Sequence, residues 1–311
     1  MRYPDNSRVC FIGDSMTHAN RVLSHIVNFY VKNFKESNIQ FFNCGTAGAR
    51  VGLALNNLQE DVFTHHPTHA VVAFGINDSC RSVMEKPRGK ECYEVSKQAF
   101  ETYKKNLKIL CDKLSEKNIK ITVCTPPPYD EYQKCDTPAL RGIYAVMVEY
   151  SHFVRKFAAQ NCYECCDYND YLTNLINFED LYKDDRGHPN DHGYFRMAEC
   201  FLKQQGLDIG VDETLPENII KWTGLVDRCR CLYAAENCIL KPEQYSLSIE
   251  EKFDVINEYI KINSPDSVPK NPEKEYVLYL AREYVKNKPL SEELNKEMMD
   301  FYHNEILNGE V

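Results

Sequence analysis

Residues 9–17 read VCFIGDSMT, an apolar run that stops abruptly at Gly13-Asp14-Ser15. A short apolar run with such an end predicts a buried β-strand, with Ser15 at the point where the strand meets a loop. In open parallel sheets the carboxyl ends of the strands carry the ligand site, so a serine at this position can reach a ligand. It can act as a nucleophile only with a base, an orienting acid and oxyanion donors, which the rest of the chain must supply.

Strands and helices are predicted to alternate along the first part of the chain. Further apolar runs follow at residues 39–42, 69–74, 119–124 and 163–167, and between them apolar residues recur at helical spacing, as at Val22, Ile26 and Phe29. This alternation predicts a parallel sheet with helices on both faces and with its carboxyl ends along one edge. A later helix is expected over residues 192–204, with Asp191 as its cap.

Polar motifs follow two of these strands, and a third motif lies in a later loop. Residues 43–48 (NCGTAG) end the second strand, residues 75–78 (GIND) end the third, and residues 185–188 (DRGH) precede the 192–204 helix. The imidazole of His188 suits a general base, because it can take the proton of Ser15 and return it to a leaving alcohol. Asp185, three residues earlier, can orient that ring. A loop histidine taken alone is more often a surface residue, so the assignment depends on the motifs occurring together.

These motifs, in this order, resemble the conserved blocks of the SGNH hydrolase superfamily, also called GDSL esterases. The resemblance covers residues 1–206 and implies a flavodoxin-like three-layer α/β/α fold with a five-stranded parallel sheet. It also implies a catalytic triad of Ser15, His188 and Asp185. The oxyanion donors that it implies are the backbone N–H groups of Ser15 and Gly48 and the side-chain amide of Asn77.

Simpler structural roles are open for the same residues. Gly48 can be a turn glycine, with Gly45 as its rival for the oxyanion site, and Asn77 can be a turn or cap residue. Asp14 and Asp78 are expected to hold loops. Arg50 is expected to contact either the substrate or solvent.

The resemblance implies a serine esterase that works through an acyl-enzyme on small acyl esters, acetyl esters of carbohydrates above all. Tyr129, Tyr132 and Tyr194 offer rings that can stack on a sugar, although tyrosines are commonly half-buried for packing alone. Within enzymes, the alternative is a lipase, lysophospholipase or thioesterase. The alternative of another class is a non-catalytic carbohydrate-binding or oligomerisation module, and the intact triad argues against it.

The composition argues against several other classes of protein. The net charge of -9 and the pI of about 5.6 disfavour nucleic acid as a partner, because phosphate binding needs a basic face. No run approaches the roughly 20 apolar residues of a membrane span, and the first residues lack the apolar core of a signal peptide. Without a secretion signal, the 14 cysteines indicate a reducing compartment, so we expect a cytoplasmic protein without a membrane partner.

The cysteine spacing does not predict a metal site. The two densest groups lack the pair of well-spaced ligand pairs that structural zinc sites show, and we interpret them as buried thiols. These groups are Cys162, Cys165 and Cys166, and Cys229 with Cys231. No glycine-rich phosphate motif is present either. We therefore expect no cofactor, and a small-molecule ester or acylated carbohydrate as the substrate.

The pattern changes after Gly206. Strand-like runs disappear, and helix starts take their place: Ser248 to Glu251 form a capping box, and Pro272 suits the first position of a helix. We therefore predict an SGNH hydrolase domain at residues 1–206 and a helical C-terminal extension at residues 207–311. The extension offers a surface through which a homo-oligomer can form.

Overall fold

The computed structural model describes residues 2–81, 90–244, 246–263, 272–287 and 291–308. The chain divides into two units, Met1–Pro216 and Glu217–Val311. The boundary expected after residue 206 lies earlier than this division, just after the last helix of the first unit. None of the described helices combines the length and the apolarity needed to cross a membrane.

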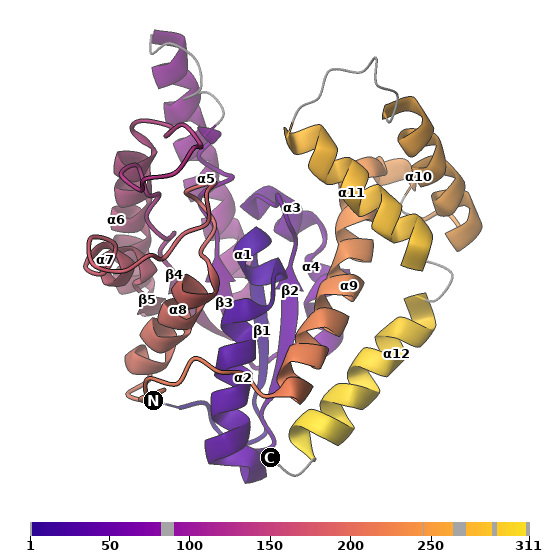
Figure 1. The fold of residues 1–311 in the computed structure, drawn as a ribbon, viewed down its shortest axis with the longest axis horizontal. Coiled ribbons are helices and arrows are strands. Elements are labelled where there is room, and N and C mark those ends of the chain that lie inside the picture. The colour runs from indigo at the N-terminus through magenta and orange to yellow at the C-terminus, as the bar shows by residue number, and fades with distance from the viewer. Residues whose placement is uncertain (1, 82–89, 245, 264–271, 288–290, 309–311) are drawn as a thin grey trace. The chain divides into compact units, whose positions relative to one another are not determined.

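A five-stranded parallel sheet forms the centre of the first unit (Figure 1). Its strands lie in the order β2-β1-β3-β4-β5, which confirms the predicted flavodoxin-like topology. Gly13 at the end of β1 pairs with Gly45 of β2 and with Ala73 of β3, so these three strands end at the same level. The strands are β1 (Arg8–Gly13), β2 (Gln40–Gly45), β3 (His69–Ala73), β4 (Lys120–Cys124) and β5 (Glu164–Cys166).

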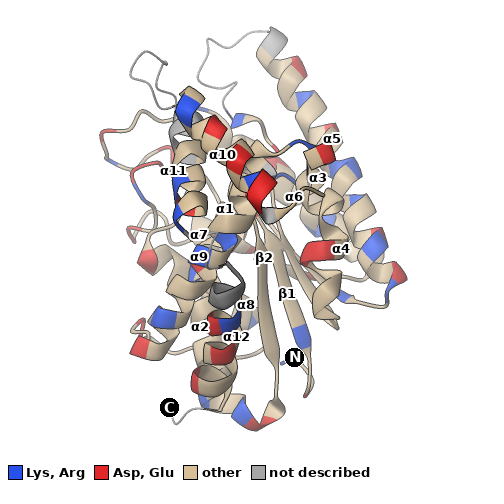
Figure 2. Cartoon of the chain, turned by 90° about the vertical axis from the view of Figure 1, so that its right-hand side faces the viewer, with Lys and Arg blue, Asp and Glu red and all other residues tan. Residues whose placement is uncertain are grey.

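Helices cover both faces of this sheet. Successive side chains of a strand point to opposite faces. Accordingly, the ring of Phe11 lies 5.4 Å from that of Phe201 on α8, while the thiol of Cys10 faces the carbonyl of Val62, 4.0 Å away, on the other side. Apart from Arg8 at its start, β1 has no charged residue, as a strand covered on both faces requires (Figure 2).

The helical segments of the first unit follow the strands in alternation. They are α1 (Ser15–His18), α2 (Arg21–Phe34), η1 (Lys35–Ser37), α3 (Val51–Asn56), α4 (Leu58–Asp61), η2 (Phe63–His65), α5 (Lys90–Glu116), α6 (Ile143–Asn161), α7 (Tyr168–Thr173) and α8 (Asp191–Gln204).

The cap of α8 differs from the prediction. The helix begins at Asp191, and the residue before it, Asn190, is the cap, because its side chain accepts a hydrogen bond of 2.9 Å from the N–H of Gly193. Asp191 therefore lies in the first turn, where its negative charge is favoured by the helix dipole.

The interpretation of the cysteines as buried thiols is correct for some of them and wrong for others. Cys166 and Cys231 are buried, whereas Cys162 is exposed at the end of α6, and Cys165 and Cys229 are partly exposed. Cys162 adopts a left-handed conformation (φ 56°) that ends the helix, so its place is set by a turn and not by packing.

The second unit is helical where the structure describes it. Its helices pack around buried apolar residues that include Leu232, Ile256 and Leu280. Ser248 and Glu251 exchange backbone-to-side-chain hydrogen bonds, which confirms the predicted capping box, and α11 begins at Pro272 as predicted. The helical segments are α9 (Glu217–Ile239), η4 (Pro242–Gln244), α10 (Ile249–Asn263), α11 (Pro272–Asn287), α12 (Ser291–Phe301) and η6 (Tyr302–Leu307).

We predict that Gly193→Ala destabilises the first unit by about 1–3 kcal/mol. An added methyl group at this first turn of α8 would lie 2.1 Å from the carbonyl oxygen of Leu181, which is backbone and cannot rotate away. Gly224→Ala in α9 is the matched control, because Gly224 is helical and exposed, with nothing within 4 Å of an added Cβ. There the substitution is expected to stabilise the helix by about 1 kcal/mol. Urea unfolding measures both variants, and midpoints that move in the same direction would contradict this account.

Candidate active site

Ser15, His188 and Asp185 form one hydrogen-bonded chain. The Oγ atom of Ser15 lies 2.6 Å from Nε2 of His188, and Nδ1 of the same ring is hydrogen-bonded to Oδ2 of Asp185. Ser15 is the first residue of α1, directly after the end of β1, and the other two residues come from the loop that precedes α8. The His188 side chain is 26% exposed, so the ring is open to an incoming molecule on part of its surface.

The loop itself orients the Asp185 carboxylate. Oδ1 accepts hydrogen bonds from the backbone N–H groups of Gly187 (3.1 Å) and His188 (2.9 Å), which leaves Oδ2 for the imidazole. Partial burial acts to raise the pKa of Asp185, but the hydrogen bonds from the His188 ring and from these N–H groups outweigh it and lower the pKa to about 2. Asp185 is therefore ionised at neutral pH and can stabilise a protonated His188 ring.

Two backbone interactions close this loop. Tyr182 and Pro189 form an isolated antiparallel bridge, and the N–H of Lys183 donates to the carbonyl of His188 at 2.9 Å. Both ends of the loop are thus held together, which restricts the positions that Asp185 and His188 can adopt.

The candidate oxyanion donors lie after β1, β2 and β3. Gly48 has a positive φ of 73°, which favours glycine, and the side-chain amide of Asn77 donates to the carbonyl of Ala49 at 3.1 Å. Asn77 therefore holds the turn that contains Gly48. Among the residues that the structure describes, the backbone N–H groups of Ser15 and Gly48 have no hydrogen-bond partner, so both are available to an oxyanion.

The geometry separates Gly48 from its rival Gly45. The N–H of Gly45 donates to Oδ1 of Asn43 at 2.9 Å, and an added Cβ on Gly45 would lie 2.4 Å from the backbone nitrogen of His18. Because Gly45 has no side chain, β2 can lie close to α1 at this point. Its N–H already donates to Asn43 and is not available to an oxyanion.

The expectation that Asp14 and Asp78 hold loops agrees with their hydrogen bonds. Oδ1 of Asp14 accepts from the N–H of Met16 at 3.0 Å and caps α1, and Oδ1 of Asp78 accepts from the N–H of Val51 at 3.1 Å at the start of α3. Both carboxyls are buried. Burial raises the pKa of Asp14 to about 6 and that of Asp78 to about 7, although the N–H donors act to lower both.

Arg186 lies between Asp185 and His188 in the sequence, and no role was assigned to it. Its side chain is buried. Its guanidinium donates to backbone carbonyls of the segment 130–137, and its own φ is 63°. Charged residues are rarely buried, so the residue type gave no signal of this position. Arg50, in contrast, is exposed at the N-cap position of α3.

The three tyrosines proposed to stack on a sugar differ in their exposure. Tyr129 and Tyr194 are each 2% exposed and belong to the core, so they cannot stack on a sugar. Tyr132 is 76% exposed. For the first two residues the packing alternative is therefore the correct one.

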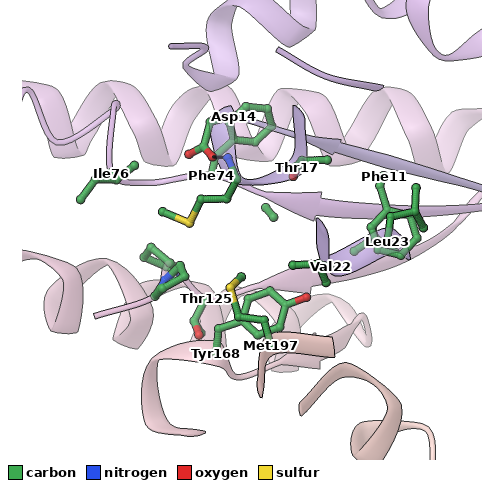
Figure 3. A pocket seen from close by; sticks show the side chains of 15 residues that line it. Phe11, Asp14, Thr17, Val22, Leu23, Phe74, Ile76, Thr125, Tyr168 and Met197 are labelled. Carbon is green, nitrogen blue, oxygen red and sulfur yellow. Dashed lines mark hydrogen bonds between the residues drawn. The ribbon is translucent and has the colours of Figure 1, made fainter. Parts of the chain in front are cut away.

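A small cavity lies near the start of α1, and neither Ser15 nor His188 is among the residues that line it (Figure 3). Asp14 and Met16, which flank Ser15, and Ile76, which precedes Asn77, contribute to its wall. Tyr168 and Met197 line the side opposite Asp14 in Figure 3. Its volume is about 30 Å³.

Comparison with protein families gives one match over more than half of the chain. Residues 11–196 match the model of the GDSL-like lipase/acylhydrolase family. This range contains Ser15, Gly48, Asn77, Asp185 and His188. A comparison with curated protein sequences gave no significant match.

Several solved structures are similar in fold. BT4096, described as a gut microbial diltiazem-metabolizing enzyme, has a TM-score of 0.71 and 17% identity, and the alignment covers 98% of this chain and 96% of that one. A catalytic mutant of Axe2, an acetylxylan esterase from Geobacillus stearothermophilus, has a TM-score of 0.56 and 20% identity, covering 68% of this chain and 100% of that one. LAE5, an alpha/beta hydrolase enzyme from the metagenome of Lake Arreo, Spain, has a TM-score of 0.54 and 21% identity, covering 66% and 97%. At these identities the likeness is one of fold.

We predict that Asp78 lowers the stability of the folded protein as the pH rises from about 4 to about 7. Its pKa is about 7 in the folded protein and about 3.9 in an unfolded chain, so its contribution is complete below pH 4 and is lost as the carboxyl ionises. Asp78→Asn keeps an acceptor for the N–H of Val51 but cannot ionise.

The free energy of unfolding of Asp78→Asn should therefore rise relative to that of the wild type between pH 4 and pH 7, by about 1.4 kcal/mol for each unit of pKa difference. Urea unfolding at pH 4, 5.5, 7 and 8 measures the difference, with Asp254→Asn at an exposed position of α10 as the control. A constant difference between Asp78→Asn and the wild type across this range would contradict the prediction.

Proposed function

The chain belongs to the GDSL-like lipase/acylhydrolase family, and within that family we propose that it is a serine esterase for small acyl esters, acetyl esters of carbohydrates above all. The family match confirms the resemblance seen in the four sequence motifs, and the chain is a hydrolase of ester bonds. The observation that carries the proposal is the hydrogen-bonded chain from Ser15 Oγ through His188 to Asp185 at the carboxyl edge of the sheet.

In the first half of the reaction, the Ser15 hydroxyl attacks the acyl carbon of the ester. Its proton moves to Nε2 of His188, which lies 2.6 Å away, and Asp185 stabilises the imidazolium that forms. The electron pair of the carbonyl moves to its oxygen, and the N–H groups of Ser15 and Gly48 and the Asn77 amide stabilise this oxyanion. The tetrahedral intermediate then breaks its bond to the alcohol, which takes the proton from His188.

In the second half, water repeats the attack on the acyl-Ser15 ester. His188 takes a proton from the water, a second oxyanion forms, and its collapse releases the carboxylic acid and restores the Ser15 hydroxyl. Each step balances with water as the only co-reactant, and each proton is moved by His188.

The preference for a short acyl group is supported by the likeness to an acetylxylan esterase. The carbohydrate part of the proposal is supported by the likeness to an acetylxylan esterase and by the exposed ring of Tyr132.

We predict that nitrophenyl acetate is hydrolysed and that kcat/KM falls as the acyl chain lengthens from acetate to octanoate, as expected of an esterase for small acyl groups. Ser15→Ala and His188→Ala should each lower kcat by at least about 10³, since the nucleophile or the base is lost. Ser115→Ala and His152→Ala are matched controls, because these residues lie on α5 and α6 and take no part in the hydrogen-bonded chain.

The steady-state kinetics of these five proteins on the ester series separate the candidate functions. A kcat/KM that rises with chain length would favour the lipase or thioesterase alternative. Full activity of Ser15→Ala would exclude the proposed nucleophile, and the absence of turnover on every ester would favour a non-catalytic module.

A further inference from the structure

The loop after β3 carries an arginine that the proposed reaction does not use. Arg81 lies four residues after Asn77 and is partly exposed. Its backbone is held by the turn before it, in which the N–H of Ser79 donates to the carbonyl of Gly75 at 2.9 Å and the N–H of Cys80 to that of Asn77 at 3.3 Å. The side chain of Arg81 therefore starts from a fixed position close in the chain to a candidate oxyanion donor.

The guanidinium of Arg81 reaches from this loop to the loop of the candidate triad. An added Cβ on Gly187 would lie 2.7 Å from Nη1 of Arg81, so the guanidinium lies against the backbone of the residue before His188. Burial raises the pKa of Asp14, the residue before Ser15, and the positive charge of Arg81 is one of the influences that act to lower it. The contact with one loop and the electrostatic effect on the other place the guanidinium beside the candidate triad.

This guanidinium is unpaired among the residues that the structure describes. It forms no hydrogen bond or ion pair with any of them, although the chain has more acidic than basic residues, 46 against 37. Other partly exposed arginines of the first unit are paired: Arg155 lies 2.7 Å from a carboxylate oxygen of Asp167, and Arg196 lies 2.8 Å from one of Glu179. Arg81 thus keeps its donors available at the position where a substrate must approach.

The carboxylates of the neighbouring motifs are already occupied. Oδ1 of Asp14 accepts a hydrogen bond from the N–H of Met16, and Oδ1 of Asp185 accepts from the N–H groups of Gly187 and His188. A charged group that is partly removed from water and has no partner costs free energy, which a bound anion would recover. The partner that suits Arg81 is therefore an anion brought by the bound molecule.

The chemistry of a guanidinium limits what that anion can be. Its N–H donors form a rigid planar fork that matches two oxygen atoms of a carboxylate or of a phosphate. The acetyl group of the proposed substrate carries no charge, so the anionic group must belong to the alcohol part of the ester.

We propose that Arg81 is a specificity-determining residue that binds an anionic oxygen group, a carboxylate or a phosphate, on the alcohol part of the ester. The inference rests on the proposed esterase function and specifies its substrate class: a small acyl ester of an acidic alcohol. Binding of the anion between the loop after β3 and the loop of His188 would hold the ester next to Ser15.

The test compares three acetyl esters of similar length. They are 3-acetoxypropionate, 2-acetoxyethyl phosphate and the neutral 3-acetoxypropionamide. With the wild-type protein, kcat/KM for at least one of the two anionic esters should exceed that for the amide about tenfold, mainly through KM, because a hydrogen bond to a charged group is made only by the anion. The better of the two anions identifies the group that Arg81 binds.

Variants of the arginine show whether it is the origin of this preference. Arg81→Gln should reduce the ratio between the better anion and the amide to about one, and Arg81→Lys should keep part of it, because the charge remains while the planar fork is lost. Lys113→Gln is the matched control, since it removes one positive charge from an exposed residue in the last turn of α5 and should leave the ratio unchanged. Equal kcat/KM for the three esters in the wild type, or a preference that survives in Arg81→Gln, would overturn the proposal.

A binding measurement makes the result independent of turnover. Calorimetric titration of the Ser15→Ala protein with the two anionic esters, with and without Arg81→Gln, should show a Kd for the better anion that rises about tenfold when the guanidinium is removed. An unchanged Kd, or no binding of either anion at millimolar concentration, would overturn the role of Arg81. Absence of turnover on all three esters with the wild type would instead count against the proposed esterase function, while the titration still decides on Arg81.

Discussion

The hydrogen bond between Ser15 and His188 joins residues that are 173 positions apart in the chain, and the proposed chemistry depends on it. Each partner is brought to this point by a different part of the fold. The parallel register of β1 with β2 and β3 ends the three strands together, which places Ser15 and the segments of Gly48 and Asn77 along one edge. The bridge between Tyr182 and Pro189 closes the loop of His188, and Gly193 allows the start of α8 to approach that loop closely. A change in any of these contacts would alter the distance between nucleophile and base.

The site also contains groups that are costly to bury. Asp14 accepts a hydrogen bond at the start of α1 and Asp78 accepts one at the start of α3, yet burial raises the pKa of both above the usual range of a carboxyl. Arg186 is a buried cation whose guanidinium, among the described residues, is hydrogen-bonded to backbone carbonyls. Such groups lower stability, and proteins retain them where a precise backbone geometry is needed. Here they hold the backbone of the Ser15 turn, of the segment after Gly48 and of the Asp185–His188 loop.

The five strands could be predicted from the sequence because apolar runs have local signatures, whereas the strand order and the five candidate residues came from the resemblance of the polar motifs to a known family. Roles that depend on residues far away in the sequence have no such local signature. Arg186 resembles any charged loop residue until the segment 130–137 folds over it, and Tyr129 and Tyr194 differ from Tyr132 only in their burial. Asn190 and Asp191 are both residue types that cap helices well, and only the hydrogen bond from the N–H of Gly193 to Oδ1 of Asn190 identifies the cap. Cys162 is exposed because it ends a helix in a left-handed conformation, a turn that its residue type does not favour.

The most direct test of the central claim is covalent labelling with a fluorophosphonate, followed by mass spectrometry of the peptides. The account predicts one adduct, on the peptide that contains Ser15, formed rapidly by the wild-type protein and slowly by His188→Ala, because the base that activates the hydroxyl is then absent. An adduct on another residue, or equal labelling rates in the two proteins, would contradict the assignment of Ser15 and His188 as nucleophile and base.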